Sequence, residues 1–218
     1  MKTLTFWFDP ISPFAYLAFE RLPQALEGLN YCVRYRPVLF AALLQHHGQL
    51  GPAEIASKRA WTYRQVLWLA RSHGVPLDLP AAHPFNPLPL LRLAVACGRD
   101  GEPNRWVCET VLRHVWRSGG ADASDPERLA ALAAQLEPQR RLDDAAARER
   151  LRAHTAEALE RGVFGVPTCE VDGRLFWGFD ALPMLRQQLA GVAPLPEALW
   201  DAAEGWPVGV QRTQRPAP

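Results

Sequence analysis

The sequence predicts an α/β protein with strands near both ends of the chain and a long helical segment between them. Residues 3–8 and 31–38 are rich in β-branched and aromatic residues, as strands are. Residues 168–171 and 175–177 have the same character and return after more than a hundred residues of helical pattern. Two β-containing segments that are far apart in sequence are therefore expected to share one sheet.

The first of these segments forms a strand–helix–strand unit. The strand over 3–8 ends at Asp9-Pro10, and a helix follows from Ser12 to about Gly28. Ser12 is a good N-cap residue, and proline is tolerated directly after it because the first helical N–H has no partner. The two strands that flank this helix should be parallel.

The second segment is a hairpin followed by a helix. Asp172-Gly173 is a tight-turn sequence between the last two strands, and a helix is predicted from Asp180 to about Leu189. Between the two segments, breaks rich in Gly and Pro separate five candidate helices, over 53–73, 87–99, 103–117, 126–136 and 143–161.

This order of elements is the thioredoxin arrangement with a helical domain inserted between its βαβ and ββα halves. We therefore divide the chain into a thioredoxin-like domain (1–40 and 162–190) and an inserted helical domain (41–161). The remainder, 191–218, is rich in proline and is predicted to be an extended tail that packs through Leu199, Trp200 and Trp206. Two unrelated domains split near residue 120 are the alternative, but they leave the hairpin without a sheet.

Composition lowers the probability of several kinds of partner. The 218 residues carry 24 basic and 23 acidic side chains, a net charge of +1, which gives no reason to expect nucleic acid or an anionic membrane. No apolar run approaches the roughly 20 residues of a membrane span. The four cysteines form no CxxC or zinc-like spacing, and His46-His47 has no partner ligands nearby. We expect a cytoplasmic protein with buried thiols and no metal.

In a thioredoxin-like module, chemistry occurs at the N-terminus of the first helix, where unpaired amides stabilise an anion. Ser12 occupies that position, and the sequence Ser12-Pro13-Phe14-Ala15 contains no thiol for disulfide exchange. Val166-Pro167, just before the third strand, is a candidate cis bond that turns the backbone of Val166 toward the same helix. A strand edge exposed there could pair with a peptide.

Four stretches of the sequence form a recognisable set: Phe8–Ala18; Gly51–Ile55 with Lys58–Ala60; His83–Pro89; and Val163–Thr168 with Trp177–Asp180. Through them the chain resembles, over nearly its whole length, the 2-hydroxychromene-2-carboxylate isomerases, relatives of the kappa-class glutathione transferases and of DsbA. It implies a homodimeric enzyme of aromatic-compound breakdown that uses glutathione to isomerise an aromatic carboxylate.

The resemblance also implies roles for particular residues. Ser12 would hydrogen-bond the glutathione sulfur, Val166 beside Pro167 would pair with the tripeptide backbone, and Phe179-Asp180 would hold its γ-glutamyl end. A hydroxyl donor and a helix N-terminus both favour the thiolate, so Ser12 activates the sulfur and does not itself attack. The thiolate would add reversibly to a conjugated carbon so that a double bond can rotate.

Two departures from the naphthalene-pathway isomerases concern the other side of the site. Glu54 stands where they place an Asn, and Gln65 to Trp68 replaces their Asp-x-x-Arg pattern. Trp68 beside Trp61 predicts a flatter, more apolar pocket for an aromatic or otherwise hydrophobic substrate. Glu54 and Lys58 are candidate glutathione contacts.

Each candidate also has a purely structural interpretation. Ser12 and Asp180 could be ordinary helix caps, Glu54 and Lys58 an i,i+4 pair on one helix, and Asn86 a turn residue. Phe14, Phe40, Trp61 and Trp68 could be core residues, and His83 shares a proline-rich loop with Asn86. We predict a substrate pocket formed by Phe14, Trp61, Trp68, His83 and Asn86. The alternatives to an isomerase are a kappa-like glutathione transferase and a non-catalytic thioredoxin-fold binding module.

Overall fold

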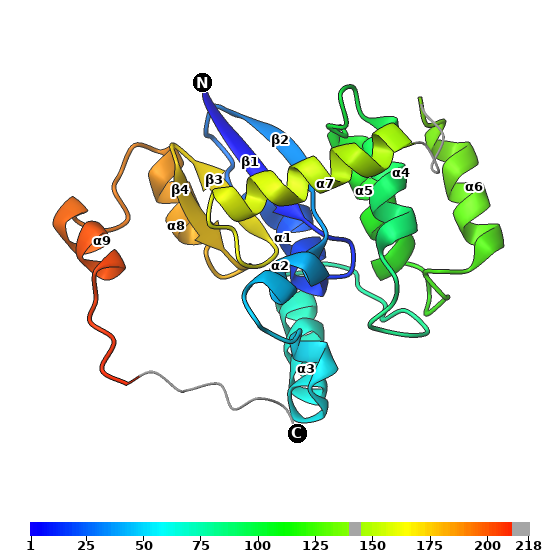
Figure 1. Ribbon diagram of the computed structural model, residues 1–218, viewed down its shortest axis with the longest axis horizontal. Coiled ribbons are helices and arrows are strands. Elements are labelled where there is room, and N and C mark those ends of the chain that lie inside the picture. Colours follow the sequence, from blue (N-terminus) through cyan, green and yellow to red (C-terminus); the bar gives the residue numbers. More distant parts are fainter. Residues whose placement is uncertain (140–144, 211–218) are drawn as a thin grey trace.

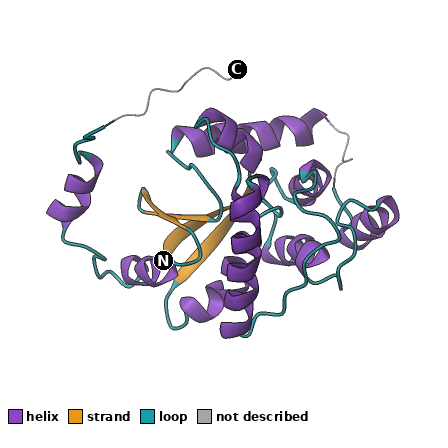
Figure 2. Ribbon diagram, turned by 90° about the horizontal axis from the view of Figure 1, so that it is seen from below, coloured by secondary structure: helices purple, strands orange, loops and turns teal. Residues whose placement is uncertain are grey.

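The computed structural model describes residues 1–139 and 145–210 and shows a four-stranded mixed sheet between helical layers (Figures 1 and 2). The strand order is β2-β1-β3-β4, with β1 (Lys2–Phe8) parallel to β2 (Tyr31–Pro37) and antiparallel to β3 (Thr168–Val171). β4 (Arg174–Trp177) completes the predicted hairpin. Because β3 pairs with β1, the alternative of two unrelated domains is wrong, and the thioredoxin-like fold class is confirmed.

Helices cover both faces of the sheet because β1 alternates its side chains between them. Leu4, Phe6 and Phe8 enter the larger core, which α1 (Pro13–Ala25) and α8 (Leu182–Leu189) also line. Trp7 points to the opposite face, into a smaller cluster with Ala158 of α7 (Ala145–Glu160) and Val163 and Val166 of the loop that follows it.

The remaining helices lie between β2 and β3 in the chain, apart from one in the tail. They are α2 (Phe40–His46), the 3-10 turn η1 (Pro52–Glu54), α3 (Ala56–Ser72), α4 (Leu88–Cys97), α5 (Arg105–Trp116) and α6 (Pro126–Leu136). The predicted helix over 53–73 is divided, because Ile55 is extended between η1 and α3. Residues 143 and 144 of the predicted helix 143–161 lie outside the described residues. The exact division of the chain into domains stays a prediction.

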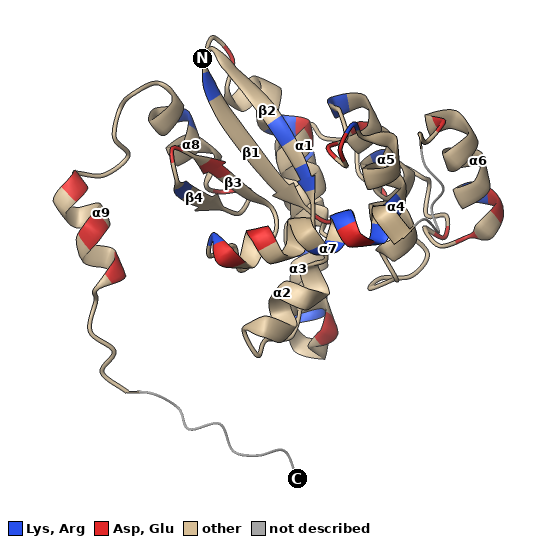
Figure 3. Ribbon diagram, turned by 45° about the horizontal axis from the view of Figure 1, so that its top comes forward, with Lys and Arg blue, Asp and Glu red and all other residues tan. Residues whose placement is uncertain are grey.

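The tail departs from its prediction. It contains α9 (Glu197–Glu204), so the expectation of an extended segment is wrong over these residues. Pro196 is at the N-cap, Glu197 begins the first turn and Gly205 ends the helix, which are ordinary helix signals among the prolines. Figure 3 shows that every charged residue of α9 is acidic. Trp200 packs against Phe176 with ring centroids 5.8 Å apart, whereas Leu199 and Trp206 are 59% and 77% exposed and do not pack as predicted.

Candidate functional site

Ser12 is the N-cap of α1, as the sequence predicts, and it is almost fully buried. Its Oγ accepts a hydrogen bond from the Ala15 N–H at 3.2 Å and donates one to the Val166 carbonyl oxygen, also at 3.2 Å. The two segments that share the site, 154 residues apart in the chain, therefore meet at one hydroxyl. Capping and a second, long-range contact coexist at this residue.

The Val166–Pro167 bond is cis, as predicted from the sequence. The Val166 side chain is buried in the smaller core, so only its backbone faces the start of α1. No hydrogen bond from the Val166 N–H to another described residue is found. The Pro167 carbonyl accepts from Gly178, which continues the pairing of the hairpin up to this loop.

The N-terminus of α1 favours an anion at this site, and three of the chain's own thiols are poor candidates to supply one. The first amides of α1 point toward Ser12, and a helix N-terminus carries about half a positive charge. Burial raises the pKa of the Cys97 thiol to about 11 and of Cys169 to about 12, and raises that of Cys108 well above its ordinary value. These three thiols are therefore protonated at neutral pH.

Asp9, three residues before Ser12, is a buried carboxyl that the sequence interpretation treated only as a turn residue. Its Oδ1 accepts from the Ile11 N–H at 3.0 Å, its Oδ2 accepts from the Phe40 N–H at 2.9 Å, and its carbonyl accepts from Ser12 at 3.0 Å. Burial raises its pKa to about 7, against the two N–H donors that lower it. Asp9 thus joins the loop before α1 to the start of α2.

Phe14 and Phe179 lie at the edge of the larger core. Both are half-buried against it, and the Phe179 ring meets His73 at the end of α3 with centroids 4.9 Å apart. Asp180 is exposed, and α8 begins at Leu182 without a side-chain cap, so the interpretation of Asp180 as a helix cap is wrong. Gly178 has φ 97, a backbone conformation that favours glycine, and a Cβ there would lie 2.5 Å from Asp180 Oδ1.

Glu54 and Lys58 are not on one helix, so the expected i,i+4 pair is wrong. Glu54 belongs to η1, and its Oε1 accepts from the Gly51 N–H at 2.7 Å in a capping box. Lys58 is exposed on α3 and has no ion pair with any described residue. Of the two, Lys58 is the one available to a ligand carboxylate.

The remaining predicted pocket residues are separated by their exposure. Trp61 and Trp68 lie two turns apart on one exposed side of α3 and are 65% and 66% exposed, so their alternative interpretation as core residues is wrong. Asn86 is exposed, and its side chain accepts from the Leu88 N–H at 3.1 Å, as the turn interpretation expects. His83 is half-buried, and its Nε2 lies 2.8 Å from the Ile11 carbonyl oxygen, beside the Ser12 loop. Their contact with substrate stays a prediction.

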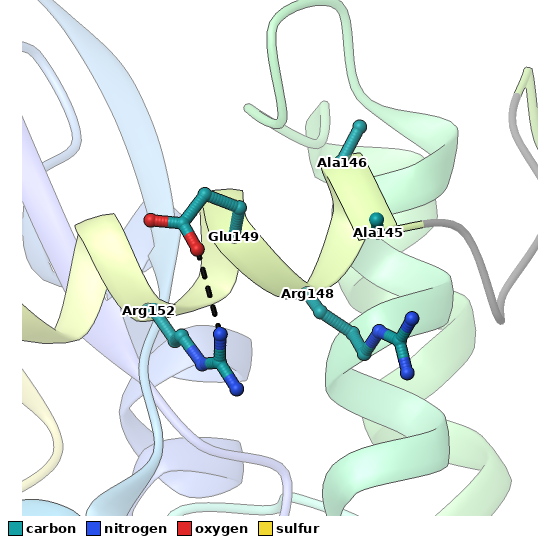
Figure 4. A pocket seen from close by; sticks show the side chains of 5 residues that line it. All are labelled: Ala145, Ala146, Arg148, Glu149 and Arg152. Carbon is teal, nitrogen blue, oxygen red and sulfur yellow. Dashed lines mark ion pairs between the residues drawn. The ribbon is translucent and has the colours of Figure 1, made fainter.

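Two surface depressions of the molecule are not lined by the predicted site residues. One of about 560 Å³ lies on α7 and is lined by Ala145, Ala146, Arg148, Glu149 and Arg152 (Figure 4). A second, of about 430 Å³, runs between α2, α4 and α7 over an apolar floor. Neither is lined by Ser12, so hydrogen bonds and not cavity size define the candidate site. No group of three or more metal-ligating side chains occurs within the described residues.

Comparison with known proteins shows to which family the chain belongs. The DsbA-like thioredoxin domain family matches residues 3–190, and the chain belongs to that family. Its site differs from a redox site in having Ser12 where a CxxC motif would stand.

Individual relatives show to which group within the DsbA-like family the chain belongs. A 2-hydroxychromene-2-carboxylate isomerase of Pseudomonas putida is 32% identical over 193 residues, covering 84% of this chain and 92% of that protein. Glutathione S-transferase kappa 1 of Rattus norvegicus is 24% identical over 220 residues, covering 91% and 96%. The solved structure of a 2-hydroxychromene-2-carboxylate isomerase superposes with a TM-score of 0.76 at 26% identity, covering 93% of this chain and 98% of that chain.

Within the DsbA-like family the chain therefore belongs with the 2-hydroxychromene-2-carboxylate isomerases and is an enzyme of the isomerase class. The alternative of a non-catalytic module is not supported.

Proposed function

We propose that the enzyme is a glutathione-dependent cis-trans isomerase of 2-hydroxychromene-2-carboxylate or a related aromatic carboxylate. The main support for this proposal is that the Ser12 hydroxyl, at the N-terminus of α1, lies against the backbone of Val166 beside a cis proline. A relative named as a kappa glutathione transferase, similar over 91% of the chain, supports glutathione as the cofactor.

The residues present fit a tripeptide thiol. Ser12 can turn its O–H from the Val166 carbonyl to a sulfur while its oxygen still accepts from Ala15. The backbone N–H of Val166 can donate to an extended peptide, and the exposed carboxylate of Asp180 can receive an α-amino group. Lys58 on α3 can pair with a carboxylate.

Glutathione would supply a thiolate that adds reversibly to a conjugated carbon of the substrate, so that a double bond becomes single, rotates and is restored. The chain's own part is to hold that sulfur as an anion. The Ser12 hydroxyl donates to it, and the amides at the start of α1 stabilise its charge. Phe14, Trp61 and Trp68 are the proposed apolar wall for the aromatic substrate, with His83 and Asn86 at its edge.

Ser12→Ala tests the proposal. We expect conversion of 2-hydroxychromene-2-carboxylate to require glutathione and to fall on the order of 100-fold in the variant, as for loss of one donor to a developing anion. Asn104→Ala is the matched control, because Asn104 caps α5 through a similar 3.0 Å bond from Val107 and both variants lose one cap. A wild-type rate independent of glutathione, or equal rates in the two variants, would refute the mechanism.

The second candidate is a kappa-like glutathione transferase, favoured by the kappa relatives. The two differ only in whether the thiol leaves again, so the product mass separates them. An unchanged mass indicates the isomerase, and a gain of one glutathione indicates the transferase.

We also propose that the enzyme is a cytoplasmic homodimer. The four cysteines are free, which suits a reducing compartment. No helix in residues 1–139 and 145–210 is long and apolar enough to cross a membrane. Large apolar side chains outside the proposed substrate wall, among them Trp106 and Trp206, are half or more exposed and are available for contact with a second copy of the chain. Light scattering should give twice the mass of one chain, and the mass of one chain would contradict the dimer.

A further inference from the structure

The two peptide units that lead into Ser12 are each held at both ends. In the unit between Pro10 and Ile11, the carbonyl oxygen accepts from the Trp116 indole Nε1 at 2.8 Å and the N–H donates to Asp9 Oδ1. In the unit between Ile11 and Ser12, the carbonyl oxygen accepts from His83 Nε2 and the N–H donates to the Asp9 carbonyl. Neither peptide plane can rotate without losing two hydrogen bonds.

The donor on His83 is fixed by chemistry. A carbonyl oxygen can only accept, so the proton lies on Nε2, and Nδ1 of a neutral ring is then an acceptor. The Tyr63 hydroxyl lies 2.9 Å from that Nδ1 and 3.1 Å from the His83 carbonyl oxygen, so its single proton is shared between these two acceptors. When it donates to Nδ1, it favours this tautomer and orients the ring. Burial lowers the pKa of His83, which favours the neutral ring.

The two side chains that donate to these carbonyl oxygens come from the helical segment between β2 and β3, not from the sheet. Trp116 ends α5, and His83 lies in the loop before α4. Their rings also pack together, with centroids 5.5 Å apart. The negative ends of the two carbonyl dipoles therefore point toward Trp116 and His83, while Ser12 and the amides at the start of α1 remain to meet an anion.

We propose that His83, oriented by Tyr63, is a positioning residue that fixes the Ser12 hydroxyl for activation of the glutathione sulfur. This role rests on the proposed function and adds to the prediction that His83 lies in the substrate pocket. The helical segment then controls the thiol half of the site as well as the substrate half.

The test compares four variants for two properties. His83→Phe keeps an aromatic ring but removes the donor, and His83→Gln can restore a donor. Tyr63→Phe removes the hydroxyl that meets Nδ1 and the carbonyl oxygen of His83. His114→Phe is the matched control, because His114 Nε2 also meets a backbone carbonyl, that of Ala123 at 3.2 Å, away from Ser12. Thiolate absorbance gives the pKa of enzyme-bound glutathione, and amide hydrogen exchange reports on the Ser12 N–H without any ligand.

We expect His83→Phe to raise the pKa of the bound thiol by about one unit, equivalent to about tenfold less thiolate below that pKa. Exchange at Ser12 should accelerate about tenfold, since the loop opens locally. Tyr63→Phe should shift both properties in the same direction by less, His83→Gln should restore most of each, and His114→Phe should change neither.

The two hypotheses fail differently. If the wild-type enzyme forms no thiolate with glutathione, the proposed function fails and with it the role in thiol activation, whatever the hydrogen exchange shows. If the wild type forms the thiolate and neither His83→Phe nor Tyr63→Phe changes its pKa, the role of His83 is overturned and the proposed function stands. Should His83→Phe fail to fold, Tyr63→Phe decides the question by the same two measurements.

Discussion

Replacing Asp9 by asparagine should change how stability depends on pH. The Asp9 carboxyl is fully buried and accepts two backbone hydrogen bonds, from Ile11 and Phe40. An asparagine side chain has nearly the same shape but offers one acceptor oxygen and an NH₂ group, which faces one of those N–H donors. That mismatch should lower the free energy of unfolding by about 1–3 kcal/mol at every pH.

The pH-dependent part of the difference in stability between wild type and Asp9→Asn comes from the raised pKa of Asp9. Burial raises it from 3.8 to about 7, so between these values the folded protein keeps a proton that the unfolded chain has released. The free energy of unfolding therefore falls as pH rises through this window, because the folded state binds more protons. A shift of roughly three units corresponds to about 4 kcal/mol. The wild type should lose this stability between about pH 4 and pH 8, and Asp9→Asn should not.

Urea unfolding of both proteins at several pH values measures the difference. The stability advantage of the wild type should shrink steadily from pH 4 to pH 8 and can change sign. Asp172→Asn is the control: its Asp lies in the hairpin turn at φ 53, a backbone conformation that asparagine also adopts, and its bond to Lys2 lowers the pKa below this window. Parallel curves for wild type and Asp9→Asn would show that the carboxyl is ionised throughout and that the reasoning from burial is wrong.

Two further predictions concern residues outside this loop. His154 on α7 is 1% exposed, neither ring nitrogen reaches a hydrogen-bond partner among the described residues, and burial together with Arg36 lowers its pKa to about 4, although the Pro37 carbonyl nearby favours its protonated form. His154→Leu should therefore raise the free energy of unfolding by about 1–3 kcal/mol at pH 7. The stability advantage of His154→Leu over the wild type should grow by about 3 kcal/mol more as pH falls from 6.5 to 4, because the unfolded wild-type chain takes up the proton first. Equal free energies of unfolding for the two proteins, measured with urea, would contradict this. Asp180→Asn should raise the KM for glutathione about tenfold, as for loss of one charge-assisted bond, and should leave the melting temperature unchanged because the residue is exposed. An unchanged KM would remove Asp180 from the site.

The sequence predicts the elements of this fold well where their signals are local. The Ser12-Pro13 start of α1 and the Asp172-Gly173 turn carry their own caps and turn residues, and both occur where predicted. The short helix α2 was not predicted. It has no side-chain cap of its own, and its first amide bonds to Asp9, 31 residues earlier in the chain.

The candidate site divides in the same way. Ser12 and the cis bond at Val166-Pro167 follow from local sequence, and the structure brings them together. The contacts of Asp9, Tyr63 and Trp116 do not follow from the sequence, because their partners are atoms distant in the chain. A fully buried acid next to a turn and a polar aromatic on an exposed helix become visible only once the burial of each is known.

The bond from Ser12 to the Val166 carbonyl has a consequence for catalysis. A hydroxyl carries one proton, so Ser12 can donate either to Val166 or to a sulfur, but not to both. Binding of a thiolate must therefore release the Val166 carbonyl, which an extended peptide on the same edge can satisfy with one of its own N–H groups. The tripeptide backbone would then stabilise the active orientation of the hydroxyl. A simple thiol, which lacks that backbone, would leave the carbonyl unpaired, at a cost of about 1–3 kcal/mol. Under the proposed function, glutathione should therefore support a higher rate than a small thiol of equal acidity because of hydrogen bonding at Val166, independently of contacts to the ends of the tripeptide.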